Sequence, residues 1–173
     1  MNTHLIYSET LSSKRTELLF IALTLLFLFL FVWRVTIPGV DFLAGIFFFL
    51  FVCFLFYSIN FKTLVIRLTA ESLKLSFGIF TWTISLNNIG EIKPDADLPW
   101  LMKYGGAGIH FMFVRKRYRA SFNFLEHSRV VIALKRQAGL VRDVSFSTCQ
   151  PNEIIRLMQG AISANKTAKT ACT

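Results

Sequence analysis

The sequence predicts an α+β membrane protein, in which an N-terminal transmembrane helical hairpin precedes a domain of about seven antiparallel strands with a C-terminal capping helix. Three patterns indicate this: two long apolar runs, a series of short alternating segments, and a final segment with helical spacing. We therefore divide the chain into a short polar cytoplasmic tail (residues 1–17), the hairpin (18–59), a cytoplasmic domain (62–163) and a disordered tail (164–173).

Both apolar runs have the length of a bilayer span. About twenty helical residues cover the ~30 Å of hydrocarbon, and residues 18–37 and 42–59 approach or reach that length with Arg34 as their one charge. The Pro38-Gly39 pair is suited to end the first helix and turn the chain. Neither run has the polar stripe of a soluble helix, and no small-x-small cleavage site follows the first. The runs therefore predict two spans.

Basic residues near the ends of the spans predict their orientation. Lys14 and Arg15 precede the first span and Lys62 follows the second, so both termini are expected in the cytoplasm. Arg34 extends to the opposite interface beside Trp33, an interfacial aromatic residue. We interpret these five residues as interfacial anchors.

The rest of the chain is taken in order. Residues 1–17 are too few to fold alone and are expected to be loose or interfacial. Alternating or β-branched segments then predict strands, at residues 63–68, 73–77, 81–86, 89–92, 109–114, 120–125, 130–134 and 140–146. From residue 151 to 162 the spacing becomes helical, and Pro151 suits a first helical turn. The remaining small and polar residues predict disorder.

The net charge of +9 belongs to the domain, because three basic and three acidic residues balance within residues 1–61. A basic domain beside a bilayer indicates anionic lipid headgroups, or simple agreement with the positive-inside rule, before it indicates nucleic acid. The densest basic cluster, which we call the basic patch, consists of Arg115, Lys116, Arg117 and Arg119. It is expected at the tip or exposed edge of a hairpin.

The basic patch has two interpretations. Each basic residue near an anionic leaflet contributes about 1 kcal/mol, so the four could contact a headgroup or an acidic partner but are not needed to recruit an anchored protein. Alternatively, they form a solvated hairpin tip whose charges discourage pairing of strand edges.

No catalytic or metal-binding constellation can be assembled from spacing. The histidines lie in different segments (His4, His110, His127), and the cysteines share no metal-ligand spacing (Cys53, Cys149, Cys172). The glycines Gly105, Gly106 and Gly108 precede a predicted strand, without the Lys-Ser/Thr and helix of a phosphate-binding loop. Asp95 and Asp97 could be paired carboxylates for a metal or acid-base step, although a loop pair of this kind is usually solvated.

The domain resembles the bacterial pleckstrin-homology-like (PH) domains of small two-span membrane proteins, over about residues 64–162. The matching segments are Leu-Thr-Ala-Glu-Ser-Leu (68–73), residues 78–84 with Trp82, Lys-Tyr-Gly-Gly-Ala-Gly-Ile (103–109), Tyr-Arg-Ala-Ser-Phe-Asn (118–123), Val-Val-Ile (130–132) and Ser-Thr-Cys-Gln-Pro-Asn-Glu (147–153). The resemblance implies a strongly bent antiparallel sheet or barrel capped by a helix, in the bacterial inner membrane. It implies no catalytic residues.

These observations favour a membrane-anchored, non-enzymatic accessory or scaffold protein, whose domain binds a protein partner or self-associates at the membrane surface. One alternative is a sensor of anionic lipid headgroups that acts through the basic patch. A second is an enzyme that acts on lipid or envelope substrates with Asp95 or Asp97. We expect no cofactor, metal or nucleic acid.

Overall fold

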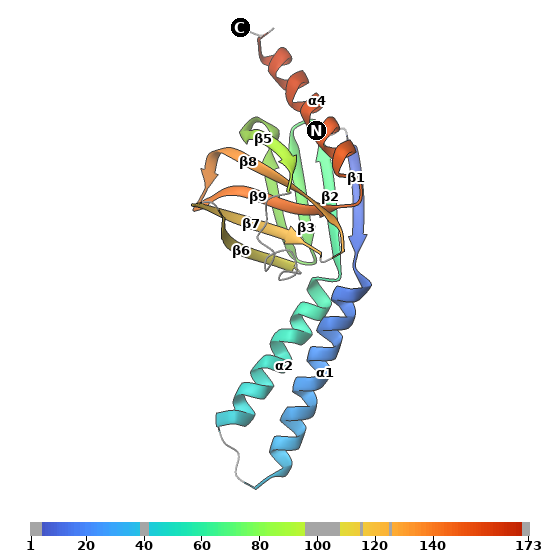
Figure 1. The fold of residues 1–173 in the computed structure, drawn as a ribbon, viewed down its shortest axis with the longest axis vertical. Coiled ribbons are helices and arrows are strands. Elements are labelled where there is room, and N and C mark those ends of the chain that lie inside the picture. Colours follow the sequence, from blue (N-terminus) through green and yellow to red (C-terminus); the bar gives the residue numbers. More distant parts are fainter. Residues whose placement is uncertain (1–4, 39–41, 96–107, 115, 125, 171–173) are drawn as a thin grey trace.

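The computed structural model describes residues 5–38, 42–95, 108–114, 116–124 and 126–170. It contains two long apolar helices at one end and a two-sheet domain with a closing helix at the other (Figure 1). The predicted α+β layout is therefore confirmed, with two helices long and apolar enough to cross a membrane.

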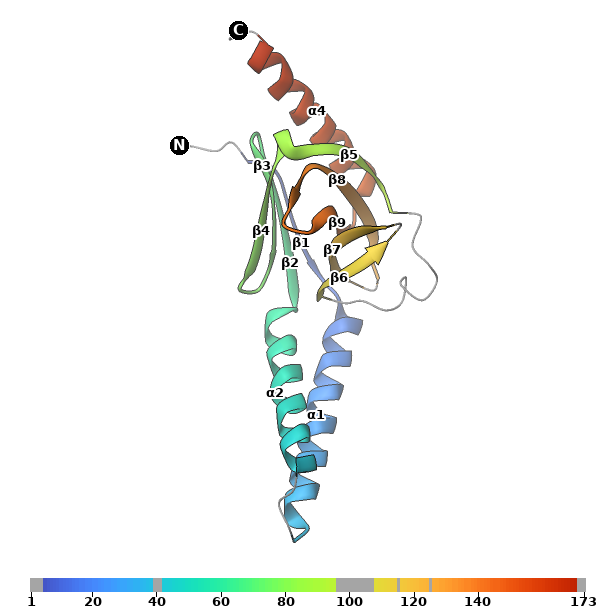
Figure 2. The same ribbon diagram turned by 90° about the vertical axis from the view of Figure 1, so that its left-hand side faces the viewer.

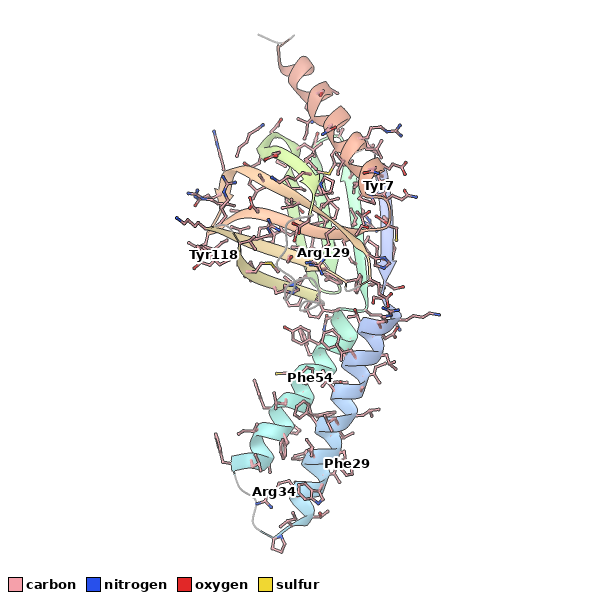
Figure 3. All side chains as sticks on the ribbon, in the orientation of Figure 1. Tyr7, Phe29, Arg34, Phe54, Tyr118 and Arg129 are labelled. Atoms are coloured by element: carbon pink, nitrogen blue, oxygen red, sulfur yellow. The ribbon has the colours of Figure 1, made fainter. Side chains whose placement is uncertain are left out.

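The helical hairpin consists of α1 (Lys14–Thr36) and α2 (Phe42–Asn60). The Ser13 side chain begins α1 by accepting from the backbone N–H of Thr16, and α1 starts four residues before the predicted span. Aromatic side chains hold the two helices together, as in the Phe27–Phe54 stack with ring centroids 5.3 Å apart. Both helices have a mean hydropathy of 2.6 over their most apolar window, and few of their residues are buried in the protein. Figure 3 shows their side chains, with Phe29 and Phe54 labelled.

Residues before the hairpin form a strand, so the prediction of a loose tail over residues 1–17 is wrong for β1 (Leu5–Ser12). β1 pairs antiparallel with β2 (Thr63–Thr69), and Ser12 lies opposite Thr63 across the start of the hairpin. The segment gains its structure from β2 rather than from itself, and Leu11 joins the core at 2% exposure. The helical hairpin is thus inserted between two neighbouring strands of one sheet.

The first sheet has the order β1-β2-β3-β4, with β3 at Ser72–Phe77 and β4 at Phe80–Ser85. Its turn between β3 and β4 touches the end of α2. Gly78 has φ +49°, and a Cβ there would lie 2.5 Å from the Asn60 carbonyl oxygen. Glycine therefore permits both the backbone conformation and the close approach that place the sheet directly above the helices.

The second sheet has the order β5-β8-β9-β7-β6. Its strands are β5 (Ile89–Pro94), β6 (Gly108–Val114), β7 (Arg117–Asn123), β8 (Ser128–Ala138) and β9 (Val141–Thr148). A 3₁₀ turn, η1 (Leu86–Asn88), joins the two sheets. β7 and β9 run parallel, so the predicted all-antiparallel arrangement is wrong at this pair. The described strands form two separate sheets rather than a closed barrel.

The two sheets pack face to face around an apolar core (Figure 2). Fully buried side chains come from both sheets, among them Leu64 and Phe77 of the first and Phe122 and Phe146 of the second. The closing helix α4 (Pro151–Thr170) adds Ile154 and Met158. Burial of such apolar side chains provides most of the stabilisation of a domain of this kind.

The closing helix is longer than predicted. Its helical spacing ends at residue 162 in the sequence, and residues 164–173 were expected to be disordered, yet the helix continues to Thr170. The Asn165 side chain donates to the Ala70 carbonyl over 2.6 Å, which ties this extension to the turn between β2 and β3. A tertiary hydrogen bond of this kind cannot be read from local composition. Residues 171–173 lie outside the described residues.

Candidate functional site

The face of the second sheet that is turned away from the apolar core carries a row of buried polar side chains, which we call the polar face. Alternate residues of β7 and β9 point away from the core, and all six are buried: Arg119, Ser121, Asn123, Asp143, Ser145 and Ser147. The parallel register places Arg119 opposite Asp143 and Ser121 opposite Ser145. Polar residues are mostly exposed in proteins, so six buried polar side chains on one sheet face mark a candidate site.

An ion pair lies at one end of the polar face. Arg119 Nη1 lies 2.9 Å from Asp95 Oδ1 and 3.1 Å from Asp95 Oδ2, and both side chains are almost completely buried. Asp143 adds a second carboxylate, 4.0 Å from Arg119 Nη2 and 3.7 Å from Arg117 Nη1. Two acidic groups therefore compensate the buried guanidinium, as a desolvated charge requires.

Hydroxyl and amide groups continue the row away from the ion pair. Asn123 Nδ2 donates to Ser121 Oγ over 2.6 Å, and the Ser121 hydroxyl is bonded to that of Ser145. The backbone N–H of Phe124 donates to Ser147 Oγ over 2.9 Å. These bonds connect β7 to β9 through side chains as well as through the backbone ladder.

Several buried polar atoms of this region have no hydrogen-bond partner among the residues that the structure describes. They are Arg119 Nε, Asn123 Oδ1, His110 Nε2 and Asp143 Oδ1, the last of which has only its ion pair with Arg117. His110 lies opposite Ser121 on β6, and burial, with a smaller effect from the charge of Arg129, lowers its pKa. A buried polar atom without a partner costs roughly 1–3 kcal/mol, so water or a bound polar group would be stabilised here.

A pocket of about 300 Å³ opens beside the ion pair. Its charged lining residues are three acidic and three basic side chains, Glu91, Asp95, Asp143, Lys93, Arg117 and Arg119, above Val131 and Ala133. The opposite charges cancel, so the pocket does not concentrate anions as a phosphate site would. It offers donors and acceptors at short range to a polar ligand or to a polar segment of another protein.

The structure separates the four residues of the predicted basic patch. Lys116 is exposed at the turn with φ +64°, whereas Arg117 and Arg119 lie inside β7, which begins three residues earlier than predicted. Arg119 is 6% exposed and paired with Asp95, so the expectation that it belongs to an exposed patch is wrong. Arg115 lies outside the described residues. Figure 3 labels Tyr118, between the two arginines of β7.

The other candidate residues from the sequence have mixed outcomes. Asp95 binds Arg119 and is not a solvated loop carboxylate, while its expected companion Asp97 lies outside the described residues, as do Gly105 and Gly106. Gly108 begins β6. Among the residues that the structure describes, no group of three acidic, histidine or cysteine side chains could hold a metal ion.

The structure places one thiol beside an imidazole, which sequence spacing did not reveal. Cys149 Sγ lies 3.6 Å from His127 Nδ1, and His127 Nε2 lies 3.3 Å from the Ser12 carbonyl oxygen. Burial and the neighbouring Glu9 carboxylate raise the pKa of Cys149. A nucleophilic cysteine requires a lowered pKa, so this pair lacks the activation that thiol catalysis needs.

The predicted interfacial anchors lie at the two ends of the hairpin. Lys62 forms an ion pair with Glu17 over 2.8 Å, and Arg15 forms one with Glu126 over 3.2 Å, so both link the helices to the domain. Lys14 begins α1, and Trp33 and Arg34 lie in its last turns at the far end. That these five residues lie at membrane interfaces stays a prediction.

No family model, curated protein or solved structure matches this chain. The resemblance to bacterial PH-like domains therefore remains a prediction. The fold and the site define a class: an α+β protein with two candidate membrane-spanning helices and a two-sheet domain that carries a buried polar face.

The polar face was not predicted, although its pattern is present in the sequence. Polar residues alternate along residues 119–123 and again along residues 143–147, and period-two alternation places each set on one face of a strand. That the two strands are parallel neighbours, and that Asp95 reaches Arg119 from another segment, depends on tertiary pairing.

Proposed function

We propose that this protein is a membrane-anchored, non-enzymatic accessory or scaffold protein whose domain binds a protein partner, or a second copy of itself, through the charged pocket at one end of the polar face. The observation that carries the proposal is the pocket beside the Asp95–Arg119 pair, where both signs of charge meet polar atoms that lack partners among the described residues. A polar segment of a protein supplies donors and acceptors together, whereas a simple anion supplies acceptors alone.

The rim of this pocket supports a binding role more than a catalytic one. Glu91, Lys93 and Arg117 are exposed at its edge, while Arg119 and Asp95 hold each other inside. Polar rims around a desolvated centre are typical of protein interfaces. The acidic and basic side chains around the pocket cancel in total charge but occupy different positions. A partner would therefore bind in the one orientation that pairs its charges with theirs.

The headgroup-sensor alternative is weakened by the same geometry. Each basic residue near an anionic leaflet contributes about 1 kcal/mol. Arg119 is buried against Asp95 and Arg117 is paired with Asp143, so less positive charge is left to attract lipid headgroups. The alternative in which an enzyme uses Asp95 or Asp97 is also weakened, because Asp95 is bonded to Arg119 through both oxygens.

The membrane assignment within this proposal comes from the sequence. The two apolar helices fit a membrane anchor, and the basic residues around them favour both termini in the cytoplasm. The resemblance to bacterial PH-like domains implies the bacterial inner membrane. We propose that the polar face lies on that cytoplasmic side.

Photo-crosslinking tests the proposal. A photoreactive residue replaces Lys93 at the pocket rim or, as the control, Lys74, which is exposed on the first sheet. Irradiation of the full-length protein in its own membranes is expected to give an adduct from position 93 and none from position 74. An adduct of twice the 19.8 kDa chain mass indicates self-association, and another defined mass indicates a partner.

A second substitution connects the adduct to the pocket. Arg117→Glu reverses one rim charge and is expected to reduce the adduct from position 93 by about ten-fold, which corresponds to ~1.4 kcal/mol. Equal adducts from positions 93 and 74, or an adduct that Arg117→Glu does not change, would count against the polar face as an interface.

A further inference from the structure

A second hollow, separate from the polar face, lies at the end of α2. It has a volume of about 340 Å³, and we call it the aromatic groove. Aromatic side chains dominate its lining, from α2 (Phe56, Tyr57), from Phe61, and from both sheets (Phe80, Phe111, Phe122). The volume falls at the low end of small-ligand sites, which span roughly 300–1,000 Å³.

The groove exists because the two sheets leave their last strands unpaired on this side. β4 ends the order of the first sheet and β6 ends that of the second, and Figure 2 shows them on either side above α2. A continuous set of aromatic contacts leads inward: Tyr57 stacks on Phe61 at 4.7 Å, Phe61 lies 5.5 Å from Phe77, and Phe77 lies 6.3 Å from Phe122. The hollow is therefore an open edge of the hydrophobic core.

The lower end of the groove belongs to the second candidate span. Phe56 and Tyr57 lie in the last turns of α2, a helix with no charged residue, and Phe56 is 40% exposed. The wall is thus continuous with a helix surface that faces hydrocarbon if α2 crosses the bilayer. A hydrocarbon chain could then enter the groove from the bilayer without passing through the aqueous phase.

The upper walls of the groove expose apolar side chains to solvent. Phe80 is 41% exposed on β4, and Phe111 is 65% exposed on β6. Covering apolar surface gains about 25 cal/mol per Å². Single exposed apolar residues are common on protein surfaces, whereas a group of exposed aromatic residues around one hollow indicates a binding site.

The chemistry of the walls favours a hydrocarbon chain over a polypeptide. The Thr81 hydroxyl in the lining is already bonded to the Ser76 hydroxyl over 3.0 Å. A peptide that entered could bond its backbone only along the edge of β4 or β6, and each N–H or C=O group that faced the aromatic rings instead would cost free energy. An acyl chain has no polar group to satisfy.

We propose that the aromatic groove binds one acyl chain of a bilayer lipid, which enters from the leaflet beside the end of α2. The bound chain completes the core at its open edge and holds the domain against the membrane surface. This site is independent of the polar face, because the two share no lining residue.

Photoactivatable lipid tests the proposal. Purified full-length protein is reconstituted in phosphatidylcholine bilayers that contain a phosphatidylcholine with a diazirine on one acyl chain, and adducts are located by peptide mass spectrometry. Adducts of intact lipid are expected on β4 or β6 beside the groove as well as on the two helices. Adducts confined to the helices would overturn the proposal, as would detection of a second protein copy in the groove.

Two matched variants on one strand sharpen the test. Phe111→Glu places a charge in the groove and is expected to reduce adducts on β4 and β6 by about ten-fold relative to those on α1. Phe113→Glu is the control, because Phe113 is also exposed on β6 but does not line the groove. Phe80→Gln repeats the test from the opposite wall if Phe111→Glu fails to fold. Equal loss in Phe113→Glu, or no loss in either groove variant, would overturn the proposal.

Discussion

The Thr148 hydroxyl donates to the Glu9 carboxylate over 2.6 Å, which joins the first described strand of the chain to the last. The same carboxylate accepts the backbone N–H of Cys149 at 2.8 Å and the Tyr7 hydroxyl at 2.9 Å. Burial and the Glu9 charge raise the pKa of Tyr7 to about 12. A segment that precedes the two apolar helices thus helps to close the domain that follows them.

Glu9→Gln is expected to destabilise the domain by roughly 1–3 kcal/mol, because an amide offers one acceptor oxygen in place of two and leaves a donor unsatisfied. Thermal unfolding of the detergent-solubilised protein measures this. Glu71→Gln is the control, since Glu71 is exposed in the turn between β2 and β3. Equal stability of the two variants would show that the Glu9 bonds contribute little.

The domain is expected to need β1 in order to fold. Residues 61–173 alone lack Leu11 and leave the edge of β2 unpaired, so they should aggregate. Residues 5–12 joined to residues 61–173 through an Asn-Gly turn should give a soluble, cooperatively unfolding domain, because Ser12 and Thr63 are already neighbours. Size-exclusion chromatography and thermal unfolding compare the two chains. A soluble, equally stable domain without β1 would contradict this prediction.

The two arginines of β7, Arg117 and Arg119, are expected to contribute very differently to the free energy of unfolding. Arg119→Ala removes the guanidinium that bonds both oxygens of the buried Asp95 carboxylate and should cost roughly 3–5 kcal/mol. Arg117→Ala should cost about 0–1 kcal/mol, because the Arg117 side chain is half-exposed and lies 3.7 Å from Asp143. Chemical denaturation measures both. In addition, Arg119→Met combined with Asp95→Leu should cost less than Arg119→Ala, since it removes both charges of the bidentate pair and leaves Asp143 beside Arg117. Equal losses for the two alanine variants would contradict the burial of Arg119.

Stability should depend on pH through His110. Burial lowers the pKa of His110, so the unfolded chain binds a proton at this residue before the folded domain does. The free energy of unfolding is therefore expected to fall as the pH decreases below about 6.5, the ordinary pKa of histidine. Denaturation midpoints at pH 8 and pH 5 should differ less for His110→Gln than for the natural sequence. If the midpoints at pH 8 and pH 5 differ equally in His110→Gln and in the natural sequence, the pH dependence comes from other residues.

Local patterns predicted the elements that depend on local chemistry. The two apolar runs gave the helical hairpin, the alternation around Trp82 and Ile84 gave β4, and Pro151 marked the start of α4. These succeed because length, periodicity and turn residues act within a few positions of each other.

The failures involve partners that are distant in sequence. β1 is a strand because β2 pairs with it across the whole helical hairpin, and β7 is parallel to β9 although β8 separates them in the chain. Asp95 and Arg119 lie 24 residues apart, so the sequence pattern predicts Arg119 as one of four surface charges and does not indicate its pairing with Asp95. The approach of Cys149 to His127 likewise depends on how the strands close.

The pairing of β1 with β2 also sets an order of events during synthesis. β1 leaves the ribosome first but cannot find its partner until both helices have been made and β2 has followed. If the two helices cross a bilayer, the sheet can form only when the chain before α1 and the chain after α2 are on the same side of it. Insertion of one helix alone would then leave β1 and β2 on opposite sides, and the domain would lack an edge strand. Under that condition, completion of the sheet depends on insertion of both helices.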